Sequence, residues 1–250
     1  MQIKDQQESS VQDAPGKSKK FELAEYLRQA ILTLELAPGS DLDETALSAL
    51  FSLSRTPLRE VFRQLAGEGY LDLRDNRGAR VSEMSYRTLR DFFLAAPMIY
   101  GAILRLAAQH ATPIQIEALK TAQSTFRAAL RDGTGADRAL ANNRFHEITG
   151  EMAGNVYLTP SFHRLLIDHA RISMTFYRPR DRRMVDNVAE AAAQHDAIIA
   201  AIEAGDEQAA AELADAHWAL SRDRIELFAM PTGLDIPLGR PAHSAKQGGV

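Results

Sequence analysis

Three histidines and an asparagine in the carboxyl-terminal half of the chain have the types and spacing of a metal site. Asn142 and His146 are four residues apart in "NNRFHEI", so they share one face if this segment is helical. His195 and His217 stand at similar distances on either side of a Gly-Asp turn, so two antiparallel helices joined there bring them to the same height. Three imidazoles without cysteine suit Zn²⁺, Ni²⁺ or a similar borderline cation.

Two other interpretations of these histidines stay open at this point. Each could be a lone hydrogen-bonded or surface side chain. Alternatively, a metal held by the three histidines could activate water in a hydrolase, with Glu147 or Asp196 as general base. Neither carboxylate lies in an H-E-x-x-H motif. The remaining histidines are expected to be ordinary lone side chains: His110, His163, His169 and His243.

A second chemical feature is a row of arginines in "SLSRTPLREVFRQLAGEGYL". Arg55, Arg59 and Arg63 are four residues apart, although the whole chain has a net charge of −4. On an amphipathic helix they are either a solvated polar face or a surface that meets DNA, since guanidinium pairs well with phosphate and guanine. Residues 54–90 hold eight arginines against five acidic residues, so this region is locally basic.

The surrounding pattern predicts the elements that position the arginines. Apolar periodicity indicates helices over residues 19–34 and 44–51, and then a third helix that carries the arginines. Ser54 or Thr56 is expected to cap this third helix, with Pro57 at its first position in the second case. "YLDLRDNRGARVS" then predicts two short strands joined by a polar turn. Three helices followed by a hairpin are the layout of a winged helix-turn-helix.

The rest of the chain predicts helices only, with a break or kink at Pro97. The fold is therefore expected to be mainly α, a winged helix-turn-helix followed by an all-α bundle. The expected divisions are a disordered tail (1–18), the DNA-binding domain (19–84), the helical domain (85–229) and a flexible tail (230–250).

Composition narrows the class of protein. The chain of 250 residues is 45% hydrophobic and 25% charged, as in ordinary globular proteins. Cysteine is absent, which excludes disulfides and thiolate metal sites and favours the cytoplasm. We expect neither a secretory signal nor a membrane partner, because no long uninterrupted apolar run occurs.

The arginine segment resembles a known family. "SRTPLREVFRQLAGEGYLDLRDNRGARV" is similar to the DNA-binding signature of the GntR superfamily of bacterial regulators. The resemblance implies operator contacts from the start of the recognition helix and from the wing tip, and a backbone contact or a solvated position for Arg63. The implied set is Ser54, Arg55, Thr56, Arg59, Arg63, Arg77 and Gly78. Thr45 stands where many relatives have an arginine, so one familiar contact is missing.

Residues 86–229 resemble the FCD-type effector domain of the FadR-like branch of that superfamily. The matching segments are "NNRFHEITGEMAGN" and "QHDAIIAAIEAGDEQAAAELADAHW". The resemblance implies a divalent metal, Zn²⁺ or another transition metal, held by Asn142, His146, His195 and His217, with Asn142 where aspartate is commoner. It also implies a homodimer on a palindromic operator, controlled by a small organic acid that completes the metal shell.

One departure from this second pattern concerns the effector. Relatives usually carry an arginine and a glutamate before "LAA", whereas this chain has Ala96 and Tyr100 there. The effector pocket is therefore expected to be lined differently. Weak candidates for contacting the effector are Tyr100, Arg171 and Arg178, although both arginines are more expected on a solvated face.

Overall fold

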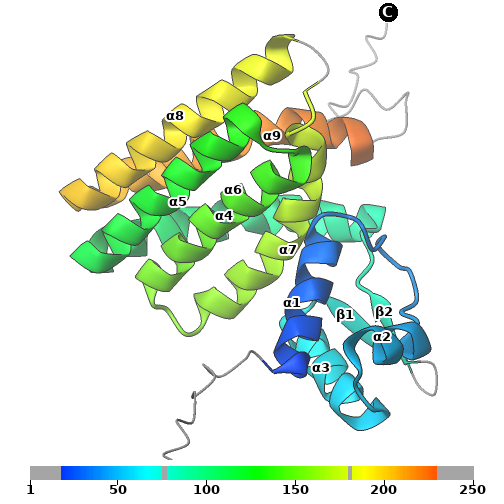
Figure 1. Cartoon of the computed structure of the whole chain (residues 1–250). Helices are drawn as coiled ribbons and strands as arrows, with labels where there is room; N and C mark the ends of the chain where they lie inside the picture. The colour runs from blue at the N-terminus through cyan, green and yellow to red at the C-terminus, as the bar shows by residue number, and fades with distance from the viewer. Residues whose placement is uncertain (1–17, 75–77, 180–181, 230–250) are drawn as a thin grey trace, which may run out of the picture.

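The computed structural model describes residues 18–74, 78–179 and 182–229, and it divides into a small amino-terminal body and a larger helical bundle (Figure 1). The two strands belong to the small body, and every other element in the described part of the chain is a helix. The prediction of a mainly α fold with an amino-terminal winged helix-turn-helix is confirmed.

The small body contains three helices and a hairpin. Its elements are α1 (Lys19–Leu32), α2 (Glu44–Phe51), α3 (Arg55–Glu68), β1 (Leu71–Arg74) and β2 (Gly78–Val81). The strands are antiparallel, with Leu71 opposite Val81. The predicted apolar stripe of α3 is buried against α1 and β1: Leu58, Val61, Phe62 and Leu65. This packing leaves the polar face of α3 in solvent.

The ends of α3 are set by its flanking residues. Ser54 is the N-cap, which decides between the two predicted starts, but its side chain makes no capping hydrogen bond. Gly69 ends the helix with φ +92°, a left-handed conformation that favours glycine. A Cβ at Gly69 would lie 2.3 Å from Cδ of Arg164, so the helical bundle also closes on this position.

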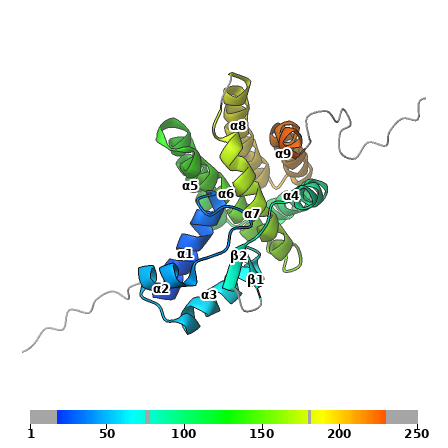
Figure 2. The same ribbon diagram turned by 90° about the vertical axis from the view of Figure 1, so that its right-hand side faces the viewer.

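The bundle contains six helices in the described part of the chain. They are α4 (Tyr86–His110), α5 (Pro113–Asp132), α6 (Gly135–Ala153), α7 (Leu158–Phe176), α8 (Arg182–Ala204) and α9 (Glu207–Ala229). Capping boxes at Thr112 and Thr134 begin α5 and α6. Viewed along the bundle, α7 passes close to α1 and α3 of the small body (Figure 2).

The prediction of a break at Pro97 is wrong, because α4 runs through it as one helix. Proline removes one backbone donor, and the packing of α4 against α6, α7 and α9 outweighs that loss. By length and composition alone, α4 is also apolar enough to cross a membrane. Its buried face, which includes Phe92, Tyr100 and Ile103, belongs to the core of the bundle.

Candidate functional site

Three helices of the bundle bring three buried histidines together. His146 comes from α6, His195 from α8 and His217 from α9, and one ring nitrogen of each lies within 4.8 Å of the others. We call this set the three-histidine centre. The His195 ring stacks on Phe145, with 3.8 Å between ring centroids and 5° between ring planes, so its orientation is fixed by packing. The structure therefore brings together the three histidines of the predicted ligand set, and their role as ligands stays a prediction.

Unpartnered polar atoms collect on the same residues. Nε2 of His146, Nε2 of His195 and Oδ1 of Asn142 are buried and have no hydrogen-bond partner among the described residues. A buried acceptor without a partner costs about 1–3 kcal/mol, so three on one predicted ligand set require a reason. A cation accepted by these lone pairs supplies one. The residues therefore fit the divalent metal that the sequence implies.

Two glutamines fix which ring nitrogens are free. Nε2 of Gln123 donates to Ala192 O and to Asp196 Oδ1, both at 2.8 Å, so its Oε1 must accept from Nδ1 of His195 at 3.0 Å. Gln194 likewise donates to Glu190, and its Oε1 accepts from Nδ1 of His217 at 3.1 Å. Both imidazoles then carry their proton on Nδ1 and present Nε2 as a lone pair. Such outer partners orient metal-binding histidines.

Electrostatics keep the imidazoles neutral. Burial, with smaller contributions from neighbouring imidazoles, holds the pKa of His146 and His195 well below the usual histidine value. Burial lowers the pKa of His217 to about 4. A neutral imidazole is the form that binds a metal, so the centre does not need to lose protons near neutral pH.

His169 corrects a prediction made from the sequence. It was expected to be an ordinary lone histidine, yet α7 buries it beside the centre, with its ring centroid 5.0 Å from that of His146. Its Nδ1 lies 2.6 Å from the hydroxyl of Tyr100 on α4. The sequence does not predict this position of His169, because "IDHARIS" contains no second potential ligand at helical spacing. Only the packing of α7 against the other helices brings His169 to the centre.

A small cavity adjoins the three-histidine centre. Its volume is about 10 Å³, room for one water-sized species. The lining includes Tyr100, His146, His169, His217 and Trp218. Tyr100, which the sequence offers as a candidate effector contact, lines this cavity, and that role stays a prediction. An organic acid needs more space than the cavity offers, so its entry requires the wall to move.

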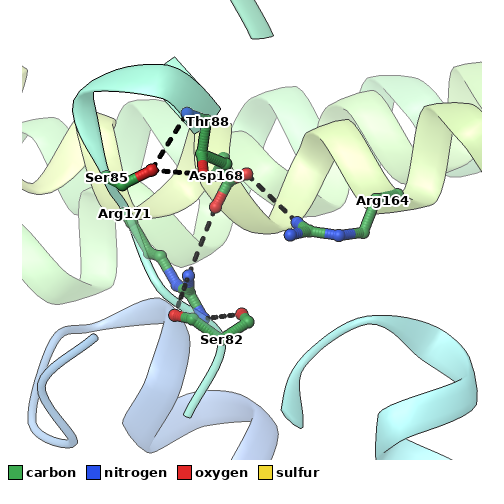
Figure 3. A network of polar contacts seen from close by, with 6 residues as sticks. All are labelled: Ser82, Ser85, Thr88, Arg164, Asp168 and Arg171. Carbon is green, nitrogen blue, oxygen red and sulfur yellow. Dashed lines mark hydrogen bonds and ion pairs between the residues drawn. The ribbon is translucent and has the colours of Figure 1, made fainter. Parts of the chain in front are cut away.

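Arg171 corrects another prediction, since it lies neither in solvent nor on the cavity. Its side chain is 0% exposed and points from α7 toward the link between the wing and α4 (Figure 3). Nη1 donates to Ser82 O at 3.1 Å and to Asp168 Oδ1 at 3.2 Å, and Nη2 donates to Ser82 Oγ at 2.8 Å. Arg164 donates to the other oxygen of Asp168 at 3.1 Å. We call these four residues the Arg171 cluster.

The remaining candidates of the bundle lie away from the centre. Arg178 follows the end of α7, is exposed, and lines a separate hollow with Thr33 and Leu34, so it does not replace the missing arginine. His110 contacts Ala153 O at 3.3 Å, and His163 is exposed, as expected for lone histidines. His243 lies outside the described residues, as do residues 1–17 and 230–250 of the predicted tails.

The predicted DNA-binding residues of α3 share one exposed face. Arg55, Thr56, Arg59 and Arg63 are all exposed, and Ser54 precedes them at the helix start. Since Ser54 does not cap the helix through its side chain, the first-turn amides of α3 keep the geometry that favours phosphate. Arg59 also pairs with Glu44 of α2, whose Oε2 lies 3.3 Å from Nη2. This pair orients Arg59 and partly offsets its charge.

The wing is described up to its tip. Gly78 begins β2 with φ +77°, a conformation that favours glycine, and a Cβ there would lie 2.8 Å from Oε1 of Glu44, whose side chain would have to move. Arg77 lies outside the described residues. Arg80 pairs with Asp41 at 2.8 Å, which fastens the wing to the segment before α2.

Comparison with protein families matches both bodies. Residues 20–81 match the family described as bacterial regulatory proteins, gntR family, and residues 97–220 match the FCD domain. Together the two matches cover the wing domain and most of the helical bundle.

Individual relatives carry regulatory names. A protein of Streptomyces ambofaciens named as an uncharacterized HTH-type transcriptional regulator is 30% identical over 188 residues, 70% of this chain and 77% of that protein. The probable D-xylose utilization operon transcriptional repressor of Paenarthrobacter nicotinovorans is 28% identical over 76% of this chain and 80% of its own length. The HTH-type transcriptional repressor RspR of Escherichia coli K12 is 31% identical over 127 residues, 51% of this chain; the match spans only 56% of RspR.

Solved structures share the fold. Escherichia coli McbR/YncC aligns over 85% of this chain and 97% of its own, with a TM-score of 0.68 at 17% sequence identity. A GntR regulator from Rhodococcus sp. RHA1 aligns over 85% of this chain and 98% of its own, with a TM-score of 0.61 at 16% identity. The chain belongs to the GntR family of bacterial transcriptional regulators, with an FCD domain after its DNA-binding domain, and it is not an enzyme.

Proposed function

We propose that this regulator binds a palindromic operator as a homodimer and represses transcription, and that a divalent metal and a small carboxylate in the helical domain control its DNA affinity. The observation that carries the proposal is the pairing, in one chain, of an exposed arginine face on α3 with the three-histidine centre. Repression is supported by the names of the relatives in Escherichia coli and Paenarthrobacter nicotinovorans. Action on DNA implies that the protein works in the cytoplasm.

The first two turns of α3 recognise the operator. Arg55, Thr56 and Arg59 reach the major groove, the uncapped helix start meets a backbone phosphate, and Gly78 lets the wing approach an adjacent groove. Arg63 lies one turn further along and contacts the backbone or solvent. Two copies related by twofold symmetry place two such helices on the two halves of a palindrome.

The metal is held by Nε2 of the three histidines, with Asn142 Oδ1 as a fourth donor. A neutral amide in place of the carboxylate common in relatives makes the shell less anionic and lowers its affinity. When bound, the metal supplies a positive charge and an open coordination position. The nitrogen and oxygen donors suit Zn²⁺, and Ni²⁺ fits the same set.

The effector would be a small carboxylate that binds in the cavity beside the residues that would hold the metal. The cavity of about 10 Å³ holds no organic acid as it stands, so binding requires the wall of Tyr100 and Trp218 to shift. An effector that binds only the shifted arrangement has different affinity for two states of the bundle, which is what control requires. The Arg171 cluster then links α7 to Ser82, at the exit from the wing.

An electrophoretic mobility-shift titration tests the DNA-binding half of this proposal. Arg59→Ala is expected to weaken operator binding at least about fivefold, because a guanidinium contact to a base contributes about 1–3 kcal/mol. Arg131→Ala removes the same charge from an exposed position on α5 and is expected to leave the affinity unchanged at constant salt. Equal affinities of Arg59→Ala and wild type would show that α3 does not read the operator.

A further inference from the structure

The contact between Tyr100 and His169 determines where the proton of His169 lies. Tyr100 is only 4% exposed, and its hydroxyl has one hydrogen-bond partner among the described residues, Nδ1 of His169 at 2.6 Å. If Nδ1 carried the ring proton and donated to the phenol oxygen, the phenol hydrogen would be buried without an acceptor. The phenol therefore donates to Nδ1, and the proton of His169 lies on Nε2.

The charge states of both groups agree with this assignment. Burial raises the pKa of Tyr100 well above its usual value, so the phenol keeps its hydrogen. His169 is buried against the rings of Tyr100 and Trp218, which disfavours a charged imidazolium, so its ring is neutral and carries one proton. Two neutral groups leave two possible directions, and only O–H donating to Nδ1 gives the phenol hydrogen an acceptor among the described residues.

His169 thus presents the opposite chemistry to the three-histidine centre. His195 and His217 present Nε2 lone pairs, whereas His169 presents an Nε2–H group. A protonated nitrogen does not bind a metal, and His169 is absent from the set whose nitrogens lie within 4.8 Å of one another. Yet His169 lines the same cavity as His146 and His217. It is a hydrogen-bond donor on a cavity that two histidines of the centre also line.

We propose that His169 is the specificity-determining residue of the effector site, donating its Nε2–H to the second oxygen of a carboxylate whose first oxygen lies on the metal. The inference rests on the proposed metal and effector. It names a ligand class: a small monoanion with two acceptor oxygens on one carbon. The described lining of the cavity includes no lysine or arginine, so the donor is neutral and a dianion gains no matching charge.

The test uses full-length protein loaded with Co²⁺, whose visible absorption reports its ligands, and acetate or formate as the probe. His169→Phe keeps a ring of similar size but has no donor. We expect it to bind Co²⁺ within about threefold of wild type but to bind acetate about 10- to 100-fold more weakly, as for a lost hydrogen bond to a charged group. Chloride, a monatomic anion without a second acceptor atom, is expected to bind both proteins equally.

Two further variants complete the design. Tyr100→Phe removes only the hydroxyl that orients His169, so we expect a loss of acetate affinity of about threefold to tenfold with Co²⁺ affinity retained. It also serves as the test if His169→Phe does not fold. His163→Phe changes an exposed histidine outside the cavity, and we expect it to match wild type.

The outcomes separate this inference from the proposed function. Equal acetate affinity in wild type and His169→Phe would overturn only the role proposed for His169. That role would also be overturned if His169→Phe lost Co²⁺ affinity as completely as His146→Ala, because His169 would then be a metal ligand. Binding of Co²⁺ without any acetate response in wild type would also overturn it, while the metal centre would stand. No Co²⁺ binding at all would overturn both.

Discussion

Two buried polar clusters lie beside α7, the three-histidine centre and the Arg171 cluster. They differ in how many of their polar atoms have hydrogen-bond partners within the protein. Around the three-histidine centre, acceptors on Asn142, His146 and His195 have no partner among the described residues. In the Arg171 cluster, both terminal nitrogens of Arg171 and both oxygens of Asp168 have partners, and only Nε of Arg171 has none in the described part of the chain.

The difference separates a proposed binding site from a contact that joins the two bodies of the protein. Unsatisfied acceptors are costly, so a cluster that retains several is arranged for something added from outside. A buried guanidinium satisfied by Ser82 and Asp168 needs nothing added, and it fixes one body of the protein against the other. His169 lies between Asp168 and Arg171 in sequence, so α7 carries a cavity residue directly beside a residue of the Arg171 cluster.

Lowering the pH is expected to have the largest effect on the free energy of unfolding, because it protonates the buried histidines when the chain unfolds. Their pKa values are depressed in the folded chain, to about 4 for His217 and about 3 for His169, against 6.5 for an ordinary histidine. Below pH 6.5 the unfolded chain binds protons that the folded chain does not, so stability falls with pH until the folded pKa is reached. At pH 5.5 each buried histidine costs about 1.4 kcal/mol, and the four together about 5 kcal/mol.

Urea unfolding of chelator-treated protein between pH 7.5 and 5.5 measures this loss. His195→Gln should reduce it by about a quarter, whereas His163→Gln, at an exposed position, should not change it. The Arg171 cluster acts in the opposite direction, because burial raises the pKa of Asp168 and protonation then favours the folded chain. A stability that is flat down to pH 5.5 would contradict the burial of neutral imidazoles.

Metal binding is expected to give the next largest change in the stability of the folded chain. A ligand that binds only the folded chain at about 1,000 times its Kd stabilises it by about 4 kcal/mol, a rise in Tm of roughly 10 °C. Differential scanning fluorimetry with Zn²⁺ or Ni²⁺ after chelation measures it. His195→Ala should abolish the shift, and His110→Ala should keep it. A shift that survives His195→Ala would place the metal elsewhere.

Substitution of Arg171 should lower the free energy of unfolding by less than removal of the metal does. Arg171→Met leaves Asp168 buried with only the partly exposed Arg164 as its partner, and breaking such a pair costs about 3 kcal/mol. Arg164→Met removes the more exposed partner and should cost under about 1 kcal/mol. Urea unfolding compares the two, and equal costs would mean that Arg171 contributes no more than a surface ion pair.

Sequence alone predicted the three-histidine centre better than the Arg171 cluster, for a physical reason. Asn142 and His146 lie one helical turn apart, and His195 and His217 flank one turn of the chain, so local geometry brings them together. Arg171 meets Ser82 across 89 residues of sequence, and no local pattern signals that contact. The same limit hid His169, whose partner Tyr100 is 69 residues away, and the continuity of α4 through Pro97 depends on tertiary packing.

The smallest effect should be the most specific, and it uses two serines of the link. Ser82→Ala removes the Oγ that accepts from Arg171 at 2.8 Å, while Ser85→Ala removes the Oγ that caps α4 by accepting from Thr88 N at 3.2 Å (Figure 3). Each should cost about 1 kcal/mol of stability.

Of these two serines, only Ser82 joins α7 to the DNA-binding body, so of the two variants only Ser82→Ala should change, by about threefold, the ratio of operator affinities with and without Zn²⁺. Because the stability costs match, a difference between the variants isolates the joint from general loosening. The same ratio in both variants and wild type would mean that the signal crosses to the wing by another contact, such as Arg164 against Gly69 at the end of α3.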